Sequence, residues 1–396
     1  MDYNVFQNNK ILKSVNENLK WELYNLLDIF EDDTKNARKI KKEQYLEEGE
    51  YLIIDQGQSE IAGYTNDKDG IYKQEYPFLI FGDHTRSIKY IDAPIFIGAD
   101  GVKLLKPKLD IKRFNVRYVY YFLQNVKLPS NGYSRHFKYL KQVVIALPIL
   151  EQQNKIVKVL DKAQELIDKR KAQIEALDEL VKSRFIEMFG NVNTNSKNWD
   201  LVSMYKLIDV VGGYAFKSTD FVEEGIPVLK IGNINAGYFK STNLMFWKRD
   251  NRLNKYLIKP GDLVISLTGT VGKNDYGNVC IMGNDYNEYY LNQRNAKLEI
   301  LSNNSLNKYY LTYILKVPEI KKRLTGISRG VRQANIANKD ILNLEVPIPP
   351  INLQNQFADF VQQVDKLKLQ IQESLKELED NFNSLMQRAF KGELFN

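Results

Sequence analysis

The chain has 396 residues, a length that favours two or more domains over a single core. Hydrophobic residues make up 43% and charged residues 27%, as in ordinary globular proteins, and no apolar run is long enough to cross a bilayer. A single cysteine, Cys280, excludes a disulfide framework and a thiolate metal cluster within the chain, and two histidines make a histidine-based metal site improbable.

The net charge of +7 is unevenly distributed along the chain. Residues 151–190 hold eight Lys/Arg against eight Asp/Glu, and residues 351–396 hold five against seven. Residues 191–350 hold 21 against 14, and residues 1–150 hold 22 against 20. A basic globular surface favours polyanions, nucleic acid first, although the small excess in residues 1–150 alone also fits an ordinary surface. The N-terminus has no basic and apolar segments of a secretion signal, so we expect a cytoplasmic protein.

The first 150 residues are expected to form a mixed α/β domain. Residues 1–20 precede the first tryptophan, and the sequence assigns them no role. Short β-type runs at residues 51–55, 77–82 and 93–98 alternate with Gly, Asn and Asp turns, and Tyr118–Asn125 has the pattern of a helix packed on a sheet. Recognition residues tend to lie on the polar loops of such a scaffold.

A long helix is predicted at residues 151–190. Pro148 stands just before its start, where a proline does not break a helix. Apolar residues then recur at heptad spacing, which indicates a coiled coil. The seam is expected at Leu160, Ile167, Ile174, Leu177 and Val181.

The remainder of the chain repeats this organisation. Residues 191–350 contain the β-type runs of a second α/β domain and a helical pattern at Lys308–Leu315. Residues 351–396 again have heptad spacing and predict a second coiled-coil helix. Its seam is expected at Val364, Ile371, Leu378 and Leu385.

An offset of 201 residues superposes the second half on the first. Pro148 falls on Pro349, and the Gln153–Asn154 pair falls on Gln354–Asn355. A period this long indicates two copies of a domain rather than a solenoid. The fold class is therefore α/β (mixed α+β), with two similar globular domains in a pseudo-two-fold repeat.

Because the two seams also superpose, the long helices are expected to pack on each other as an antiparallel pair. The alternative is that each helix packs only on its own domain. An antiparallel rod of roughly 58 Å would place two basic domains where both could meet one DNA duplex, about one to two turns apart.

No catalytic motif is complete. Gly269–Lys273 resembles a phosphate-binding loop, but it has two residues between its glycines instead of four, and Asn274 follows the lysine, so a strand-end turn is the better interpretation. Glu319 and Lys321 offer one carboxylate, too few for the metals of a nuclease. The signatures Asp/Asn-Pro-Pro-Tyr and G-x-G-x-x-G are absent. The sequence predicts a non-catalytic chain without a metal or cofactor of its own.

Several loops carry residues suited to duplex DNA, because Arg pairs with guanine edges, Asn and Gln with adenine edges, and Lys and Ser with phosphates. Solvated basic loops are common, so a single such loop does not indicate DNA binding, but both halves have them. In the first domain the expected DNA-binding residues are His84, Thr85, Arg86, Tyr133, Ser134, Arg135, His136 and Lys138. In the second they are Tyr214, Phe216, Lys217, Ser218, Asn292, Gln293, Arg294, Arg323, Ser328, Arg329, Arg332 and Gln333.

The sequence resembles the specificity (S) subunits of type I restriction-modification enzymes over nearly its whole length. The resemblance is carried by Leu147–Gln153 and Ile348–Gln354, by the helix ends Leu180–Asn191 and Ser384–Phe395, and by Tyr51–Thr65, Gly212–Phe221 and Leu291–Arg294. It implies four segments: target-recognition domains at 1–150 and 191–350, and conserved coiled-coil helices at 151–190 and 351–396. It also implies that each domain reads one half of a bipartite DNA site.

The same resemblance implies partner subunits. Two modification subunits would dock on the helices, bind S-adenosylmethionine and methylate adenine. A restriction subunit with motor and nuclease activity would use ATP and Mg²⁺.

The two domains also differ, which predicts an asymmetric site. Asp28–Lys42 of the first domain stands where the second has the glycine-rich Gly212–Ser218. Two alternatives stay open from the residues alone. One is a self-contained restriction or modification enzyme with a divergent catalytic centre, and the other is an adaptor whose domains bind protein.

Overall fold

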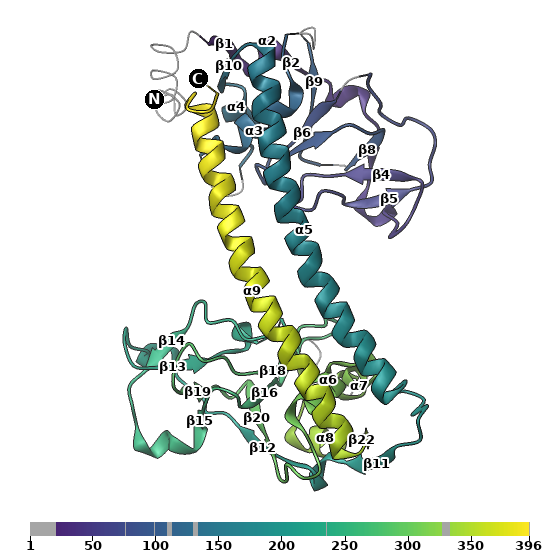
Figure 1. The fold of residues 1–396 in the computed structure, drawn as a ribbon, viewed down its shortest axis with the longest axis vertical. Coiled ribbons are helices and arrows are strands. Elements are labelled where there is room, and N and C mark those ends of the chain that lie inside the picture. Colours follow the sequence, from purple (N-terminus) through teal and green to yellow (C-terminus); the bar gives the residue numbers. More distant parts are fainter. Residues whose placement is uncertain are drawn as a thin grey trace. The chain divides into compact units, whose positions relative to one another are not determined.

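The structure is a computed structural model of the chain, and it divides into two compact units. Unit 1 comprises residues 1–172 and 372–396, and unit 2 comprises residues 173–371. Each unit therefore contains one globular part and a segment of each long helix (Figure 1). The four-segment division based on the sequence stays a prediction. The structure describes residues 21–75, 77–98, 100–108, 113–129, 134–234, 236–326 and 333–395.

The globular part of unit 1, residues 21–147, is called head 1 below, and two four-stranded sheets form its framework. Runs of buried Ile, Leu and Phe make the central strands, as expected where both faces of a sheet are covered. The first sheet is antiparallel, with the order β2 (Phe30–Asp32), β9 (Val102–Pro107), β6 (Phe78–Gly82) and β7 (Ile88–Ile91). The second is mixed, with the order β3 (Lys39–Ile40), β8 (Ile95–Gly98), β4 (Tyr51–Ile54) and β5 (Gly63–Thr65).

The helices of head 1 cover the first sheet's core. Asn115 caps the principal helix, and its side chain accepts hydrogen bonds from two backbone N–H groups that would otherwise be unpaired. The head closes where its first strand, β1 (Glu22–Asn25), pairs with its last, β10 (Val144–Leu147). The helices are α2 (Leu26–Ile29), α3 (Val116–Gln124) and α4 (Phe137–Leu140), with 3₁₀ turns at Thr34–Asn36 and Lys42–Gln44.

Head 2, residues 200–348 of unit 2, repeats the topology of the first sheet. Its order is β12 (Ile208–Gly212), β20 (Asn295–Ile300), β16 (Leu263–Ser266) and β18 (Val279–Ile281), again antiparallel. It closes in the same way, with β11 (Asp200–Ser203) paired to β22 (Glu345–Ile348). A further pair, β17 (Thr268–Thr270) with β21 (Gln333–Asn335), extends the connection between β16 and β18.

The second sheets of the two heads share three strands and differ in the fourth. In head 2 the order is β14 (Met245–Trp247), β13 (Ile226–Leu229), β19 (Tyr289–Leu291) and β15 (Leu257–Ile258). The parallel pair β13–β19 corresponds to β4–β8 of head 1. The edge strand β15 pairs antiparallel to β19, whereas β3 of head 1 pairs parallel to β8. The two domains are thus similar but not identical.

Helices of head 2 also follow the pattern of head 1. They are α6 (Lys308–Lys316), α7 (Pro318–Thr325) and α8 (Asn338–Leu342), with 3₁₀ turns at Met204–Lys206, Ser218–Asp220, Ile231–Asn233 and Asn251–Tyr256. The helices predicted near residues 118 and 308 are therefore present as α3 and α6.

Both predicted long helices are confirmed: α5 spans Leu150–Phe189 and α9 spans Ile351–Phe390, 40 residues each (Figure 1). Their segments run antiparallel within unit 2, where Phe185 packs on Phe357 with ring centroids 5.4 Å apart and Lys368 Nζ lies 2.6 Å from Asp178. Within unit 1, Lys171 Nζ lies 3.3 Å from Glu379.

The end of each long helix enters the head that does not precede it in the chain. Met386 and Phe390 of α9 belong to the buried core of head 1, together with Leu160 of α5. Phe185 and Phe189 of α5 belong to the core of head 2. The alternative in which each helix packs only on its own domain is therefore wrong.

The predicted seam positions are all covered to some degree. Leu160, Ile167, Val181, Val364 and Ile371 are buried. Ile174, Leu177, Leu378 and Leu385 are half-buried.

Candidate nucleic-acid interface

In head 1, the turn between β6 and β7 holds the segment before α4. Asp83 is 4% exposed, and its carbonyl oxygen accepts a hydrogen bond from His136 N at 2.8 Å while Oδ1 accepts one from Phe137 N at 2.7 Å. The loop at Gln56 joins them, because its side-chain oxygen accepts from His84 N at 3.2 Å and its carbonyl accepts from Ser87 Oγ at 3.0 Å. Three loops are thereby locked into one surface.

Arg86 stands at the most exposed point of this turn. Its backbone is left-handed, with φ of 63°, and its N–H donates to the carbonyl of Gly82 at 2.7 Å. The guanidinium reaches the carbonyl of Leu128 at 3.3 Å but stays exposed to solvent. A left-handed arginine is uncommon, and here it aims a long cationic side chain outward.

The predicted DNA-binding residues of head 1 differ in how exposed they are. Arg86, Arg135 and Lys138 are exposed, and His84, Thr85 and Ser134 are half-buried on the same loops. Tyr133 lies outside the described residues. His136 requires a correction: it is 1% exposed, and its Nδ1 lies 3.0 Å from the carbonyl oxygen of Asp83. A buried imidazole cannot reach a base or phosphate, so His136 fixes the loop instead.

In head 2, the loop after β12 and the turn after β19 are joined through the backbone. Tyr214 N donates to Leu291 O at 2.8 Å, and Gln293 N donates to Tyr214 O at 2.9 Å. Leu267 N, next to β17, donates to Arg294 O at 2.8 Å. The Tyr214 loop, the Arg294 turn and the β17 segment therefore form one continuous surface.

Aromatic packing stiffens this surface. Phe216 lies 5.0 Å from both Tyr214 and Trp247, measured between ring centroids, and 5.5 Å from Tyr290. Phe216 is half-buried in this cluster, so it supports the loop, whereas Tyr214 is 36% exposed. The surrounding side chains of Lys217, Ser218, Gln293 and Arg294 are exposed, and Asn292 is half-buried.

The remaining predicted residues of head 2 lie near α7. Arg323 is exposed, and its Nη2 donates to Asn193 Oδ1 at 3.4 Å. Gln333 lies in β21, where its backbone is paired with Thr270. Ser328, Arg329 and Arg332 lie outside the described residues.

Each head is fastened to the start of its long helix by the duplicated Gln-Asn pair. In unit 1, Gln153 Oε1 accepts from Asn115 N at 2.8 Å, and Asn154 Oδ1 accepts from Asn115 Nδ2 at 2.8 Å. Gln153 Nε2 also donates to Pro148 O at 2.7 Å. We call this arrangement the clasp. It explains why the same short segment recurs in the sequence: its side chains hold the N-cap residue of α3.

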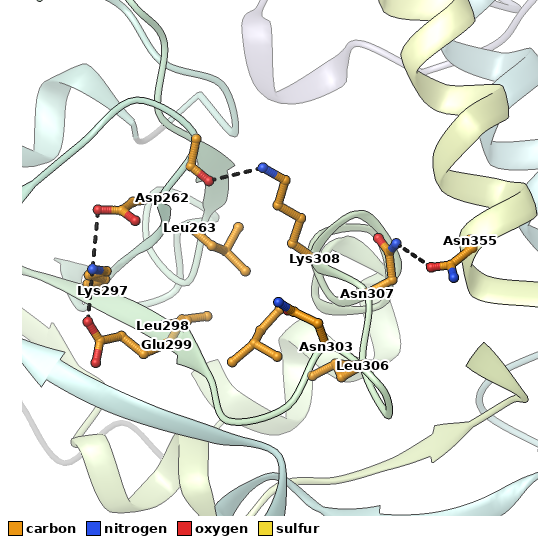
Figure 2. A pocket seen from close by; sticks show the side chains of 12 residues that line it. Asp262, Leu263, Lys297, Leu298, Glu299, Asn303, Leu306, Asn307, Lys308 and Asn355 are labelled. Carbon is orange, nitrogen blue, oxygen red and sulfur yellow. Dashed lines mark hydrogen bonds and ion pairs between the residues drawn. The ribbon is translucent and has the colours of Figure 1, made fainter. Parts of the chain in front are cut away.

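The clasp of unit 2 has the same geometry. Gln354 Oε1 accepts from Asn307 N at 2.8 Å, its Nε2 donates to Pro349 O at 2.7 Å, and Asn355 Oδ1 accepts from Asn307 Nδ2 at 2.8 Å. Figure 2 shows the last contact, with Asn355 projecting from α9 to Asn307 at the start of α6. No local sequence signal marks Asn307 and Asn115 as partners, because they lie 47 and 38 residues before Gln354 and Gln153.

The hollow beside this clasp, about 750 Å³, contains charges that neutralise one another (Figure 2). Lys297 Nζ lies 3.3 Å from Asp262 and 2.8 Å from Glu299. Burial disfavours the charge of Lys297, but its hydrogen bonds to Glu299 and Asp262 outweigh burial and raise its pKa. Lys308 Nζ donates to Gly261 O at 3.4 Å. These contacts join the sheet to α6. Because the charges nearly cancel, a charged ligand would find little electrostatic attraction in this hollow.

Among the described residues, no three His, Cys, Asp or Glu side chains are grouped so that they could hold a metal ion. Burial raises the pKa of the Cys280 thiol to about 12. None of the helices in the described ranges combines the length and the apolar composition that a membrane span needs.

The two heads are unlike α/β domains, and each is clasped to one of two antiparallel long helices. Each head presents Arg, Lys and amide side chains on interlocked loops. This arrangement defines a class of protein that recognises its target through two separate domains. The chain belongs to the family of type I restriction modification DNA specificity domains, which matches residues 18–176 and 196–379. The family resemblance and the fold class predicted from the sequence are confirmed.

The relatives share modest identity with this chain. The MjaVIII specificity subunit of Methanocaldococcus jannaschii, a type I restriction enzyme subunit, is 28% identical over 247 residues, 58% of this chain and 57% of the relative. The match therefore spans little more than half of that protein. The EcoBI specificity subunit of Escherichia coli is 20% identical over 74% of this chain and 68% of the relative.

A solved structure shares the fold. The S subunit of a type I restriction-modification system from M. genitalium superposes with a TM-score of 0.52, over 95% of this chain and 97% of that chain, at 17% identity.

Proposed function

We propose that this chain is the DNA sequence-specificity subunit of a type I restriction-modification complex, and that each head reads one half of a bipartite site. The observation that carries the proposal is the exposure of base-reading side chains on locked loops in both heads. Arg86 and Arg135 stand on head 1, and Gln293 and Arg294 stand on head 2. Arginine donates two hydrogen bonds to a guanine edge and glutamine pairs with adenine, which makes such loops suited to direct readout.

The two heads read different sequences, so the site is asymmetric. Their second sheets have different edge strands, and the aromatic loop at Tyr214–Phe216 of head 2 stands where head 1 has a charged segment. Unlike loops present unlike donors and acceptors to the major groove.

The chain itself performs no catalysis in this proposal. Modification subunits that bind S-adenosylmethionine dock on the paired helices, and restriction subunits that use ATP and Mg²⁺ join them, all in the cytoplasm. Five apolar side chains on the long helices support a docking role, because each is more than 40% exposed: Leu166, Leu180, Ile186, Leu367 and Leu369. In the assembled complex the helices also fix the spacing between the two half-sites.

A reconstitution tests this function. The purified chain with S-adenosylmethionine and duplex DNA is expected to transfer no methyl groups, whereas addition of modification subunits gives adenine methylation at a bipartite motif. Methyl transfer by the chain alone would instead support the self-contained enzyme. An adaptor that binds only protein would show no salt-sensitive binding to duplex DNA, since counterion release makes DNA affinity fall steeply with salt.

A further inference from the structure

The connection between β16 and β18 carries a basic pocket that the function above does not use. The pocket is about 430 Å³ in volume and lies between this hairpin and α7. Four lysines line it, Lys273 from the hairpin, Lys316 from the end of α6, and Lys321 and Lys322 from α7. Among the described residues that line the pocket there is no aspartate or glutamate, although the Asp275 carboxylate of the same hairpin attracts Lys273 and Lys321. The Lys316 ammonium lies over the Tyr313 ring, so Lys273, Lys321 and Lys322 are the cations that give this concave site its preference for an anion.

The hairpin is fastened so that the pocket keeps its shape. Tyr276 is 3% exposed, and its hydroxyl donates to Thr325 O at the end of α7 at 2.8 Å. Lys321 Nζ donates to Asn278 Oδ1 at 2.6 Å and to Asn274 O at 3.3 Å, which fixes one ammonium group in the wall.

The hairpin's own carboxylate, Asp275, is held by two hydrogen bonds from Thr270, at 2.8 and 2.9 Å.

The pocket adjoins the surface expected to read DNA. Leu267, at the base of the hairpin, is hydrogen-bonded to the carbonyl of Arg294, and β17 pairs with β21. Lys273 and Lys322 are exposed and therefore accessible to a large partner. This continuity favours a polymeric anion over a small free one.

We propose that Lys273, Lys321 and Lys322 form a phosphate-binding pocket that grips the backbone of duplex DNA and orients head 2 on it without reading sequence. The inference rests on the proposed function and deepens it. Phosphate contacts set register and orientation, while base contacts specify sequence. The Gly269–Lys273 segment thus contributes one lysine, Lys273, to a pocket completed by α7, and it does not act as a nucleotide-binding loop.

The described residues of head 1 form no equivalent of this phosphate-binding pocket. Its β6 and β7 correspond to β16 and β18 in sheet order, but they are joined by a short turn, residues 83–87, with Arg86 as its cation. Among the described residues, the pocket is therefore a feature of head 2 and not of head 1.

The test compares the salt dependence of duplex binding by the full chain and by a Lys273→Gln/Lys322→Gln variant. Anisotropy of a labelled mixed-sequence duplex is measured between about 50 and 200 mM salt. The slope of log K against log salt is negative, and its magnitude is expected to decrease by about 0.9 for each phosphate contact removed, hence by about 1.8 in the double variant. A Lys273→Arg/Lys322→Arg variant keeps both charges and is expected to keep the wild-type slope.

Lys206, an exposed lysine in the 3₁₀ turn Met204–Lys206 of head 2, is the matched control, and Lys206→Gln is expected to leave the slope unchanged. Equal slopes for the double variant and the wild type would overturn the proposal. So would a double variant that loses calorimetric binding of inorganic phosphate while its DNA slope stays unchanged, because the pocket would then hold a small anion. A wild-type chain with no salt-dependent duplex binding would instead overturn the proposed function itself.

Discussion

At the scale of single residues, the proposed recognition of DNA requires loop side chains that are free to reach a base edge. Arg294 is exposed on a turn whose backbone is held from both sides, by Tyr214 and by Leu267. His136 has the same kind of sequence context but is buried as an internal anchor. Residue type and loop position predict a DNA contact for both side chains. Only the hydrogen bonds of Asp83, which hold His136 inside the head, distinguish the two.

Arg294→Ala is expected to weaken recognition of one half-site only. Loss of one bidentate arginine contact costs about 1–3 kcal/mol of discrimination against the wrong base. Methylation by the assembled complex is measured on duplexes with single changes in either half of the motif. Arg135→Ala, in head 1, is the comparison and is expected to affect the other half. A loss spread equally over both halves by either variant would contradict independent heads.

At the scale of elements, the start of each long helix is set by the clasp. Gln153 and Gln354 are fully buried, and each accepts a hydrogen bond from the backbone N–H of an N-cap residue, Asn115 of α3 and Asn307 of α6. A buried donor left without its acceptor costs free energy, so removal of either glutamine side chain is expected to weaken the attachment of that head to its helix.

Gln354→Ala is expected to lower the free energy of unfolding by about 1–3 kcal/mol, because Asn307 N–H and Pro349 O lose their partner in a buried site. Denaturant unfolding of the full chain measures the change. Gln356→Ala, two residues further along the same helix at an exposed position, is the control and is expected to change stability little. If the two variants unfold at the same denaturant concentration, the clasp contributes no stability.

These elements show which parts of the fold the sequence could predict. Heptad spacing and the 201-residue offset are regular patterns, so the long helices and the repeat can be predicted from the sequence. The repeated Gln-Asn pair of the clasp can be recognised in the sequence. Its partners Asn115 and Asn307 cannot, because they are distant in the chain. The different pairing of β3 and β15 left no signal, because strands this short carry little periodicity.

At the scale of the whole molecule, neither head is a continuous piece of chain. The core of head 1 includes the last turns of α9, and the core of head 2 includes the last turns of α5. Each unit therefore depends on residues about two hundred positions away in the sequence.

Phe390→Ala is expected to destabilise head 1 and not head 2. The Phe390 ring lies 5.4 Å from Tyr118 and 5.3 Å from Phe122, centroid to centroid, and loss of a buried phenylalanine costs about 3–5 kcal/mol. Hydrogen exchange is expected to show lost protection in α3 with α6 unchanged. Phe395→Ala, at a position 49% exposed, serves as the control. Lost protection in α6 instead of α3 would contradict the crossed arrangement.

We propose that the paired helices set the spacing between the two half-sites that the heads read. The methylated adenines of a genome carrying the complex measure that spacing. The comparison is with a chain shortened by one heptad in each long helix, residues 171–177 and 370–376, which removes about 10 Å, or about three base pairs, while keeping the heptad phase. The shortened chain is expected to give the same two unlike half-sites with a shorter gap. An unchanged gap, or a single uninterrupted motif in the wild type, would contradict the proposal.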